Sequence, residues 1–173
     1  EYNGGYEVSC NNANDGSIDI TVDGGTENYT FTWTGPNGFT SSAEDLTGLG
    51  AGTYVVVVED QNFCSDTQTF ILEQSDEMQL VVNSVEAGPN INGDIMVGSG
   101  EINVTVTGGT ENYQYSWTAT LPNGDTFTAS TEDISGLFAG TYTLTVTDEN
   151  NCQVTVTETV PFISPSDWSV DET

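Results

Sequence analysis

The sequence contains no lysine, arginine or histidine, although it is 173 residues long and carries 27 aspartates and glutamates. Charged residues usually make up about a quarter of a chain, and many of them are basic. The formal net charge of −27 is therefore a compositional constraint. Without cations the chain cannot neutralise phosphate, so we expect no nucleic-acid partner and no attraction to anionic membranes. Metal cations and basic proteins suit this acidic chain better, and self-repulsion keeps it soluble.

The missing basic residues also argue against an enzyme. General base catalysis and activated nucleophiles normally depend on histidine or lysine, and only paired carboxylates or an unassisted cysteine remain here. The visible acidic pairs, Glu44-Asp45 and Glu132-Asp133, recur at matching turn positions, which favours a structural role in a repeat. We expect no catalytic residues. A chain without lysine or arginine also offers trypsin-like proteases no cleavage site.

Long apolar runs are absent too, so we expect no direct insertion into a membrane. The sequence begins at Glu1 instead of methionine, from which we expect that a leader was removed. Three cysteines, without histidine and without a zinc-type cysteine pair, are typical of structural thiols in an oxidising compartment. The expected location is extracellular or at the cell surface.

One motif occurs twice, at residues 49–60 and 137–148. In each copy a leucine, two spacers, a glycine, one spacer and a tyrosine open a run rich in valine or threonine. Gly52 and Tyr54 hold these places in the first copy, and Gly140 and Tyr142 in the second. This spacing predicts a sandwich strand that begins at a tyrosine corner, where glycine allows the turn and the tyrosine hydroxyl binds nearby backbone.

A second repeated motif settles the domain organisation that we expect. Residues 24–29 recur as residues 108–113, and the four extra residues of the second copy fall in a turn region, 118–128. The fold class is therefore all-β, with two tandem immunoglobulin-like or fibronectin-III-like β-sandwich domains. We expect the first at residues 1–74, the second at 75–162, and a tail at 163–173.

Alternating apolar and polar residues predict individual strands in the first domain. We expect strands at residues 6–10, 18–22 and 40–46, with Trp33 as the core tryptophan of a sandwich. The junction at residues 73–77 is too short for a free linker, so we expect the domains to stack end to end as a stiff rod.

The two motifs together resemble the SprB-type repeats of large Bacteroidota cell-surface proteins. The residues that carry the resemblance in the first copy are Gly24, Gly25, Thr26, Tyr29, Trp33, Leu49, Ala51, Gly52, Thr53, Tyr54, Val58, Asp60, Asn62 and Cys64. In the second copy they are Gly108, Gly109, Thr110, Tyr113, Trp117, Leu137, Ala139, Gly140, Thr141, Tyr142, Val146, Asp148, Asn150 and Cys152. The resemblance covers roughly residues 10–160. It implies an exported, non-catalytic repeat protein, commonly an adhesin carried by gliding-motility machinery and secreted by a type 9 system.

The disulfide candidates are Cys10, Cys64 and Cys152. Cys10 and Cys64 are expected toward opposite ends of one sandwich, about 15–20 Å apart, whereas a disulfide needs Cα atoms within roughly 7 Å. Stacked domains bring Cys10 toward Cys152 instead. The family-like repeats often carry both early and late cysteines, which implies the Cys10–Cys64 pair, and intermolecular or unpaired thiols stay open as a third possibility.

Calcium is the one cofactor that the sequence allows, because Ca²⁺ takes carboxylate and backbone oxygens. The weak candidates are Asp15, Asp60 and Asp148, and none matches a full calcium-loop spacing. Solvated turn acids are the alternative interpretation. We otherwise expect no cofactor.

Two functions remain. The leading one is a structural or adhesive repeat module of an exported stalk, adhesin or filament, acting as a rigid, protease-resistant spacer that meets copies of itself or further repeats end to end. The alternative is a carbohydrate-binding module of a secreted protein, whose exposed aromatics for surface glycans would be Tyr2, Tyr6, Phe39 and Trp168. The tail contains Trp168 in a pattern similar to the start of the second domain, so it is either the first strand of a further repeat or a strand donated to another molecule.

Overall fold

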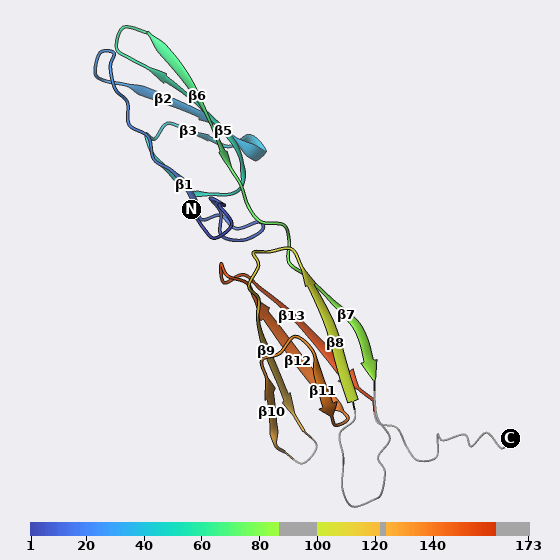
Figure 1. The fold of residues 1–173 in the computed structure, drawn as a ribbon. Helices are drawn as coiled ribbons and strands as arrows, with labels where there is room; N and C mark the ends of the chain where they lie inside the picture. Colours follow the sequence, from blue (N-terminus) through green and yellow to red (C-terminus); the bar gives the residue numbers. More distant parts are fainter. Residues whose placement is uncertain (87–99, 122–123, 162–173) are drawn as a thin grey trace, which may run out of the picture. The chain divides into compact units, whose positions relative to one another are not determined.

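The computed structural model describes residues 1–86, 100–121 and 124–161. These residues are almost entirely β-structure and divide into two compact units, Glu1–Glu77 and Met78–Thr173 (Figure 1). All strand pairs are antiparallel. The predicted all-β fold of two tandem sandwiches is confirmed. The tail expected from residue 163 lies outside the described residues.

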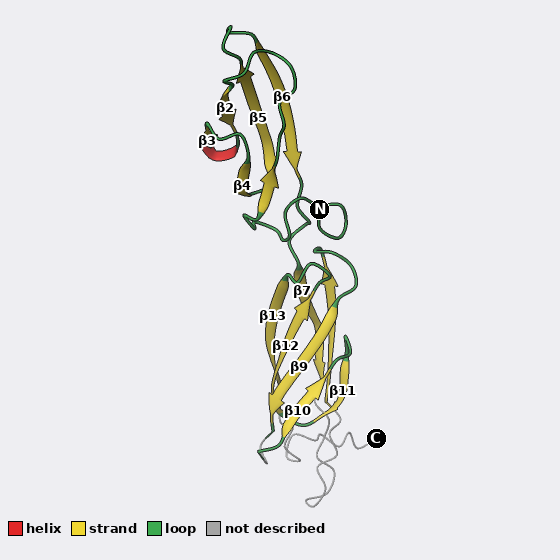
Figure 2. Cartoon of the chain, turned by 90° about the vertical axis from the view of Figure 1, so that its left-hand side faces the viewer, coloured by secondary structure: helices red, strands yellow, loops and turns green. Residues whose placement is uncertain are grey.

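Unit 2 is a sandwich of a three-stranded and a four-stranded sheet. The orders are β11-β8-β7 and β10-β9-β12-β13, and Figure 2 shows the strands of this unit in yellow. The strands are β7 (Gln79–Glu86), β8 (Gly100–Thr107), β9 (Gln114–Thr120), β10 (Thr126–Ala129), β11 (Ile134–Leu137), β12 (Gly140–Thr147) and β13 (Gln153–Val160). This arrangement is close to the two-sheet immunoglobulin constant fold. The fourth strand of the unit, β10, pairs with β9, the strand that carries Trp117.

The core of unit 2 follows from strict alternation along β12. Tyr142, Leu144 and Val146 have no exposed surface and pack against Trp117. The threonines between them face outward, where the hydroxyl of Thr143 lies 3.1 Å from that of Thr157 across the sheet. An apolar inner face and a polar outer face therefore come from one period-2 pattern.

Unit 1 repeats the four-stranded sheet but has a reduced second sheet. The sheets are β3-β2-β5-β6 and β1-β4. The strands are β1 (Gly16–Ile18), β2 (Thr30–Thr34), β3 (Thr40–Ser41), β4 (Leu46–Leu49), β5 (Gly52–Glu59) and β6 (Ser65–Leu72), with a 3-10 turn, η1, at Pro36–Gly38. Trp33 is fully buried in the core, as predicted.

Three strand predictions for unit 1 need correction. Residues 6–10 form bends, because Gly4 and Gly5 both have positive φ and turn the chain just before them. The strand expected at 18–22 ends at Ile18. The strand expected at 40–46 is two strands in different sheets, since β3 pairs with β2 and β4 with β1.

Both tyrosine corners are formed. The Tyr54 hydroxyl donates to the Gly50 carbonyl at 3.0 Å, and the Tyr142 hydroxyl donates to the Phe138 carbonyl at the same distance. Burial raises the pKa of both phenols above the ordinary value. The corner motif therefore fixes the start of β5 and of β12 in the way the spacing indicates.

The two corner glycines differ in their surroundings, which gives a matched pair of variants. Gly52 has a φ of 146°, and a Cβ there would lie 2.3 Å from the Pro36 ring, whereas a Cβ on Gly140 would meet nothing closer than 3.8 Å. We expect Gly52→Ala to lower the free energy of unfolding by about 2–3 kcal/mol through strain and overpacking. Gly140→Ala should change it by well under half that amount. Urea unfolding of both variants measures the difference, and equal losses would contradict the account of the corner.

Candidate functional site

An aspartate at the end of the corner strand closes a turn in each unit. In unit 1 the Asp60 carboxylate accepts hydrogen bonds from the backbone N–H groups of Thr26, Asn62 and Cys64, at 3.0, 2.8 and 2.9 Å. The Asn62 side chain completes the link by donating to the Thr26 hydroxyl at 2.8 Å. One carboxylate thus joins the β5–β6 turn to the loop before β2. We call this arrangement the aspartate clamp.

Unit 2 contains the same aspartate clamp in a buried form. Asp148 accepts the N–H groups of Thr110, Asn150 and Cys152, each at 2.9 Å. Its side chain is 2 % exposed, while Asp60 is only partly buried. A buried carboxylate needs compensation, and three backbone donors supply it here without any basic side chain.

The calcium candidates Asp15, Asp60 and Asp148 all accept such local hydrogen bonds. Asp15 accepts the Ser9 N–H at 3.1 Å and the Tyr2 hydroxyl at 3.0 Å. Among the residues that the structure describes, no group of three or more aspartates, glutamates or cysteines is placed to hold a metal ion. The clamp geometry is satisfied by backbone donors alone, and calcium at these aspartates stays a prediction.

The aspartate clamp of unit 1 makes stability depend on pH. Hydrogen bonds from the backbone of Cys64 and Thr26 hold the pKa of Asp60 below its ordinary value. A carboxyl whose pKa is lowered by folding stabilises the fold above its unfolded value of about 4, and this contribution is lost as pH falls through the folded value. Asp60→Asn should therefore unfold at lower urea concentration at pH 7 and lose less further stability between pH 6 and pH 3.

The measurement is the urea midpoint of each variant across that pH range. Glu59→Gln is the control, because it removes one charge from the neighbouring residue. If Asp60→Asn kept the pH dependence of the parent chain, the clamp would not be the source of that dependence.

The three cysteines differ in their oxidation state. Cys10 and Cys152 are both disulfide-bonded. Cys64 is a free thiol and is exposed. A Cys10–Cys64 bond is therefore not formed, and the Cys10–Cys152 pair stays a prediction.

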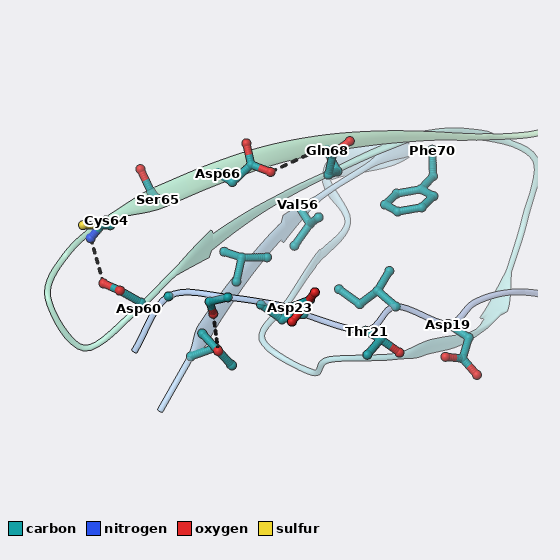
Figure 3. A pocket seen from close by; sticks show the side chains of 16 residues that line it. Asp19, Thr21, Asp23, Val56, Asp60, Cys64, Ser65, Asp66, Gln68 and Phe70 are labelled. Carbon is teal, nitrogen blue, oxygen red and sulfur yellow. Dashed lines mark hydrogen bonds between the residues drawn. The ribbon is translucent and has the colours of Figure 1, made fainter. Parts of the chain in front are cut away.

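A groove opens in unit 1 beside the aspartate clamp. It runs between residues 19–23, which follow β1, and strand β6, and its volume is about 620 Å³. Its apolar floor includes Ile20, Val22, Val58 and Phe70, all only partly buried. Figure 3 shows Val56 and Phe70 between the segment with Asp19 and Thr21 and the strand with Asp66 and Gln68.

The groove exists because unit 1 has no counterpart of β7. In unit 2, β7 pairs with β8 over its whole length, and Met78, Leu80 and Val82 pack against the core. In unit 1, described without gaps from residue 1 to 77, β1 pairs only with β4. Val104 of unit 2 is consequently 4 % exposed, while Ile20 at the matching place is only partly buried.

Acidic side chains line the apolar floor. Asp19, Asp23, Asp60 and Asp66 all belong to the groove lining. A side-chain hydrogen bond from Gln68 lowers the pKa of Asp66, so this carboxyl stays ionised well into the acidic range. Cys64 lies in the same lining and leaves a reactive group at one end of the groove.

Phe63 is a surface feature that the sequence pattern did not indicate. Its side chain is 82 % exposed, and its backbone φ is +62°, a conformation that bulky residues rarely adopt. The matching residue of unit 2 is Asn151, with φ +65°. Comparison of the two copies could have marked Phe63, since asparagine tolerates this conformation and phenylalanine does not.

The exchange between the copies gives a direct test of backbone strain at Phe63. Phe63→Asn places the residue of unit 2 in the same turn and should raise the free energy of unfolding by about 1 kcal/mol. Asn151→Phe is the reverse control and should lower it by a similar amount. Thermal unfolding of both variants measures the change, and a loss of stability in Phe63→Asn would show that Phe63 makes compensating contacts.

The four aromatics expected at the surface differ in their placement. Tyr2 is 38 % exposed, and Tyr6 is partly buried. Phe39 packs edge-on against Tyr54, with ring centroids 5.4 Å apart, so it belongs to the corner more than to the surface. Trp168 lies outside the described residues.

Comparisons with known proteins give a family match and matches to solved structures. The family model described as "SprB repeat" matches residues 7–38 and 98–120. No curated protein matches the chain. A solved structure titled "Structure of amphioxus IgVJ-C2 molecule" covers 87 % of this chain and 98 % of its own, with 13 % identity and a TM-score of 0.35. Both family matches reach through the strands that carry the core tryptophans, β2 in unit 1 and β9 in unit 2.

Proposed function

Because the chain carries two SprB-type repeats, we propose that it is a structural or adhesive module of an exported cell-surface stalk, adhesin or filament. Repeats of this family are typical of cell-surface proteins. The described part of the chain contains no helix long and apolar enough to cross a membrane. Each copy of the matched segment supplies one strand to each of the two sheets of its unit, β1 and β2 in unit 1 and β8 and β9 in unit 2, and this observation carries the proposal. Gliding motility and type 9 secretion are the setting that the family implies.

We assign the module a non-catalytic role. The large buried side chains, such as Trp33 and Trp117, are used for packing, and their indole N–H groups donate to backbone carbonyls of Ala43 and Thr131. The aspartates with the most hydrogen bonds, Asp60 and Asp148, hold turns together. These residues support spacing and rigidity better than chemistry on a substrate.

The disulfide favours a load-bearing spacer. With Cys64 free and the other two cysteines bonded, we take Cys10 and Cys152 as partners. Force applied to the ends of the chain then passes through that bond and not through the residues between the two cysteines. The spacer keeps its length as long as the bond is oxidised, and copies or further repeats join at its ends.

Single-molecule stretching tests this role. An oxidised chain held by its two termini should release only residues outside the bond, which include β13 (Gln153–Val160), and should show no full unfolding step of either unit before the tethers fail. Cys152→Ser, or the reduced chain, should unfold in two steps that each release on the order of 250 Å of chain, at about 3.6 Å per residue.

Cys64→Ser is the matched control, because it removes the free thiol and should stretch like the parent. Two full unfolding steps in the oxidised parent would contradict the spacer proposal, since the bond would not carry the load.

Phe63 favours carbohydrate binding as a second candidate. An aromatic ring that is 82 % exposed in a strained turn is a suitable platform for a sugar ring. Binding of the parent chain to a surface glycan array that Phe63→Asn abolishes would support this role. Equal binding by both chains would remove Phe63 as the platform.

A further inference from the structure

We propose that the groove of unit 1 binds residues 167–172 of a second copy of this chain, which add there as the antiparallel strand that unit 1 lacks. The inference rests on the proposed function, because it specifies how copies join end to end. The partner is identical in chemistry to the chain itself. The site lies wholly within unit 1, between residues 19–23 and β6.

Unit 2 shows what fills such a groove. Its strand β7 supplies Leu80 and Val82 to the core, and Met78, the residue just before β7, packs there too. The methyl end of Met78 lies 3.1 Å from where a Cβ on Gly109 would be, directly beside the clamp residue Asp148. Gly25 holds the matching place in unit 1, and there the nearest atoms are those of Asp60 and Tyr29. The place of the methionine is thus vacant at Gly25.

The residues that precede β1 do not supply the missing strand. The Tyr2 N–H donates to the Tyr6 carbonyl at 2.7 Å, and the Gly5 N–H donates to the Tyr2 carbonyl at 3.1 Å. Neither of these hydrogen bonds involves residues 19–23. Val8 packs beside Gly16 and Leu72, none of which belongs to the groove lining.

The tail carries a pattern similar to the start of unit 2, allowing one residue of slack. Asp76 precedes Met78 and Leu80 after the last strand of unit 1, and Asp167 precedes Trp168 and Val170 after the last strand of unit 2. Both segments alternate apolar with polar residues. In a chain of repeats, the residues after one unit provide the first strand of the next. The open groove of unit 1 in another copy offers a place for such a strand.

The match fixes the register of the added strand. Leu80 pairs with Val106 in unit 2, so Val170 is placed opposite Val22 of the second copy. Trp168 takes the place of Met78, over Gly25 and close to Cys64. An indole is larger than the methionine side chain, and the groove of about 620 Å³ offers the room. Main-chain hydrogen bonds give such an added strand its affinity, and the apolar pockets fix its register.

Charge opposes this contact at low salt. Asp19, Asp23, Asp60 and Asp66 line the groove, and Asp167, Asp171 and Glu172 flank the two apolar residues of the tail. Screening of like charges should therefore strengthen binding as salt rises. A basic peptide in the same groove would show the opposite dependence. The direction of the salt effect distinguishes the two occupants.

The test uses the free thiol of the full-length chain. A bimane label on Cys64 is quenched on contact with tryptophan, and Trp33 and Trp117 are fully buried and out of its reach. Unlabelled chain added to labelled chain should quench the label in a saturable manner, and raising NaCl from 50 to 500 mM should tighten the binding several-fold.

The variant Trp168→Ser is the control that distinguishes the chain that provides the tail from the chain that provides the groove. Labelled Trp168→Ser chain should still be quenched by added unlabelled parent, because its groove is intact. Labelled parent should not be quenched by unlabelled Trp168→Ser chain. This asymmetry does not depend on altering the groove, so misfolding of unit 1 cannot imitate it.

Three outcomes would overturn the proposal. Quenching that does not depend on concentration would place the tail in the groove of its own chain. Association without quenching would place the contact elsewhere on the molecule. Association that weakens with salt would exclude two acidic segments as partners. None of these outcomes would refute the surface spacer, whose test is the stretching of a single chain.

Discussion

Backbone N–H groups donate the hydrogen bonds to carboxylates that basic side chains donate in most proteins. Asp60 and Asp148 each accept three of them at the turn that ends the corner strand, and Asp45 and Asp133 accept the N–H groups of Ile20 and Val104. A chain with 27 acids and no cation must place its carboxylates either in water or against such donors. The positions of the turns follow from this requirement.

Local patterns predicted much of the fold because their physics is local. The spacing of Gly52 and Tyr54 predicts a tyrosine corner, and Trp33 lies in a strand of alternating apolar and polar residues. Two short motifs were therefore enough to predict two sandwiches. The strand expected at residues 6–10 failed because two preceding glycines turn the chain. The strain at Phe63 and the groove were not predictable in the same way. The groove depends on a strand that is missing, and alternation at residues 18–22 looks the same whether or not a partner strand is present.

The two units therefore share one fold and differ in their second sheet, which lacks one strand in unit 1. Unit 2 completes its three-stranded sheet with β7 and keeps the clamp residue Asp148 buried, whereas unit 1 leaves Asp60 partly exposed beside its groove. Small sandwiches gain most of their stability from buried apolar area, so an uncovered groove is costly to a single copy. A tail strand from another copy would bury that apolar surface. The same contact would then contribute to the free energy of assembly and to the stability of unit 1.

Hydrogen exchange of backbone amides in a dilute, monomeric sample tests this difference between the units most directly. Since the N–H groups of Ile20 and Val104 point to Asp45 and Asp133, those of Thr21 and Thr105 point to the opposite side of each segment. In unit 2 that side is paired, Thr105 with Val81. The account predicts that the Thr21 amide exchanges at least a hundredfold faster than the Thr105 amide. Equal protection of the two amides in the monomer would mean that unit 1 is already closed.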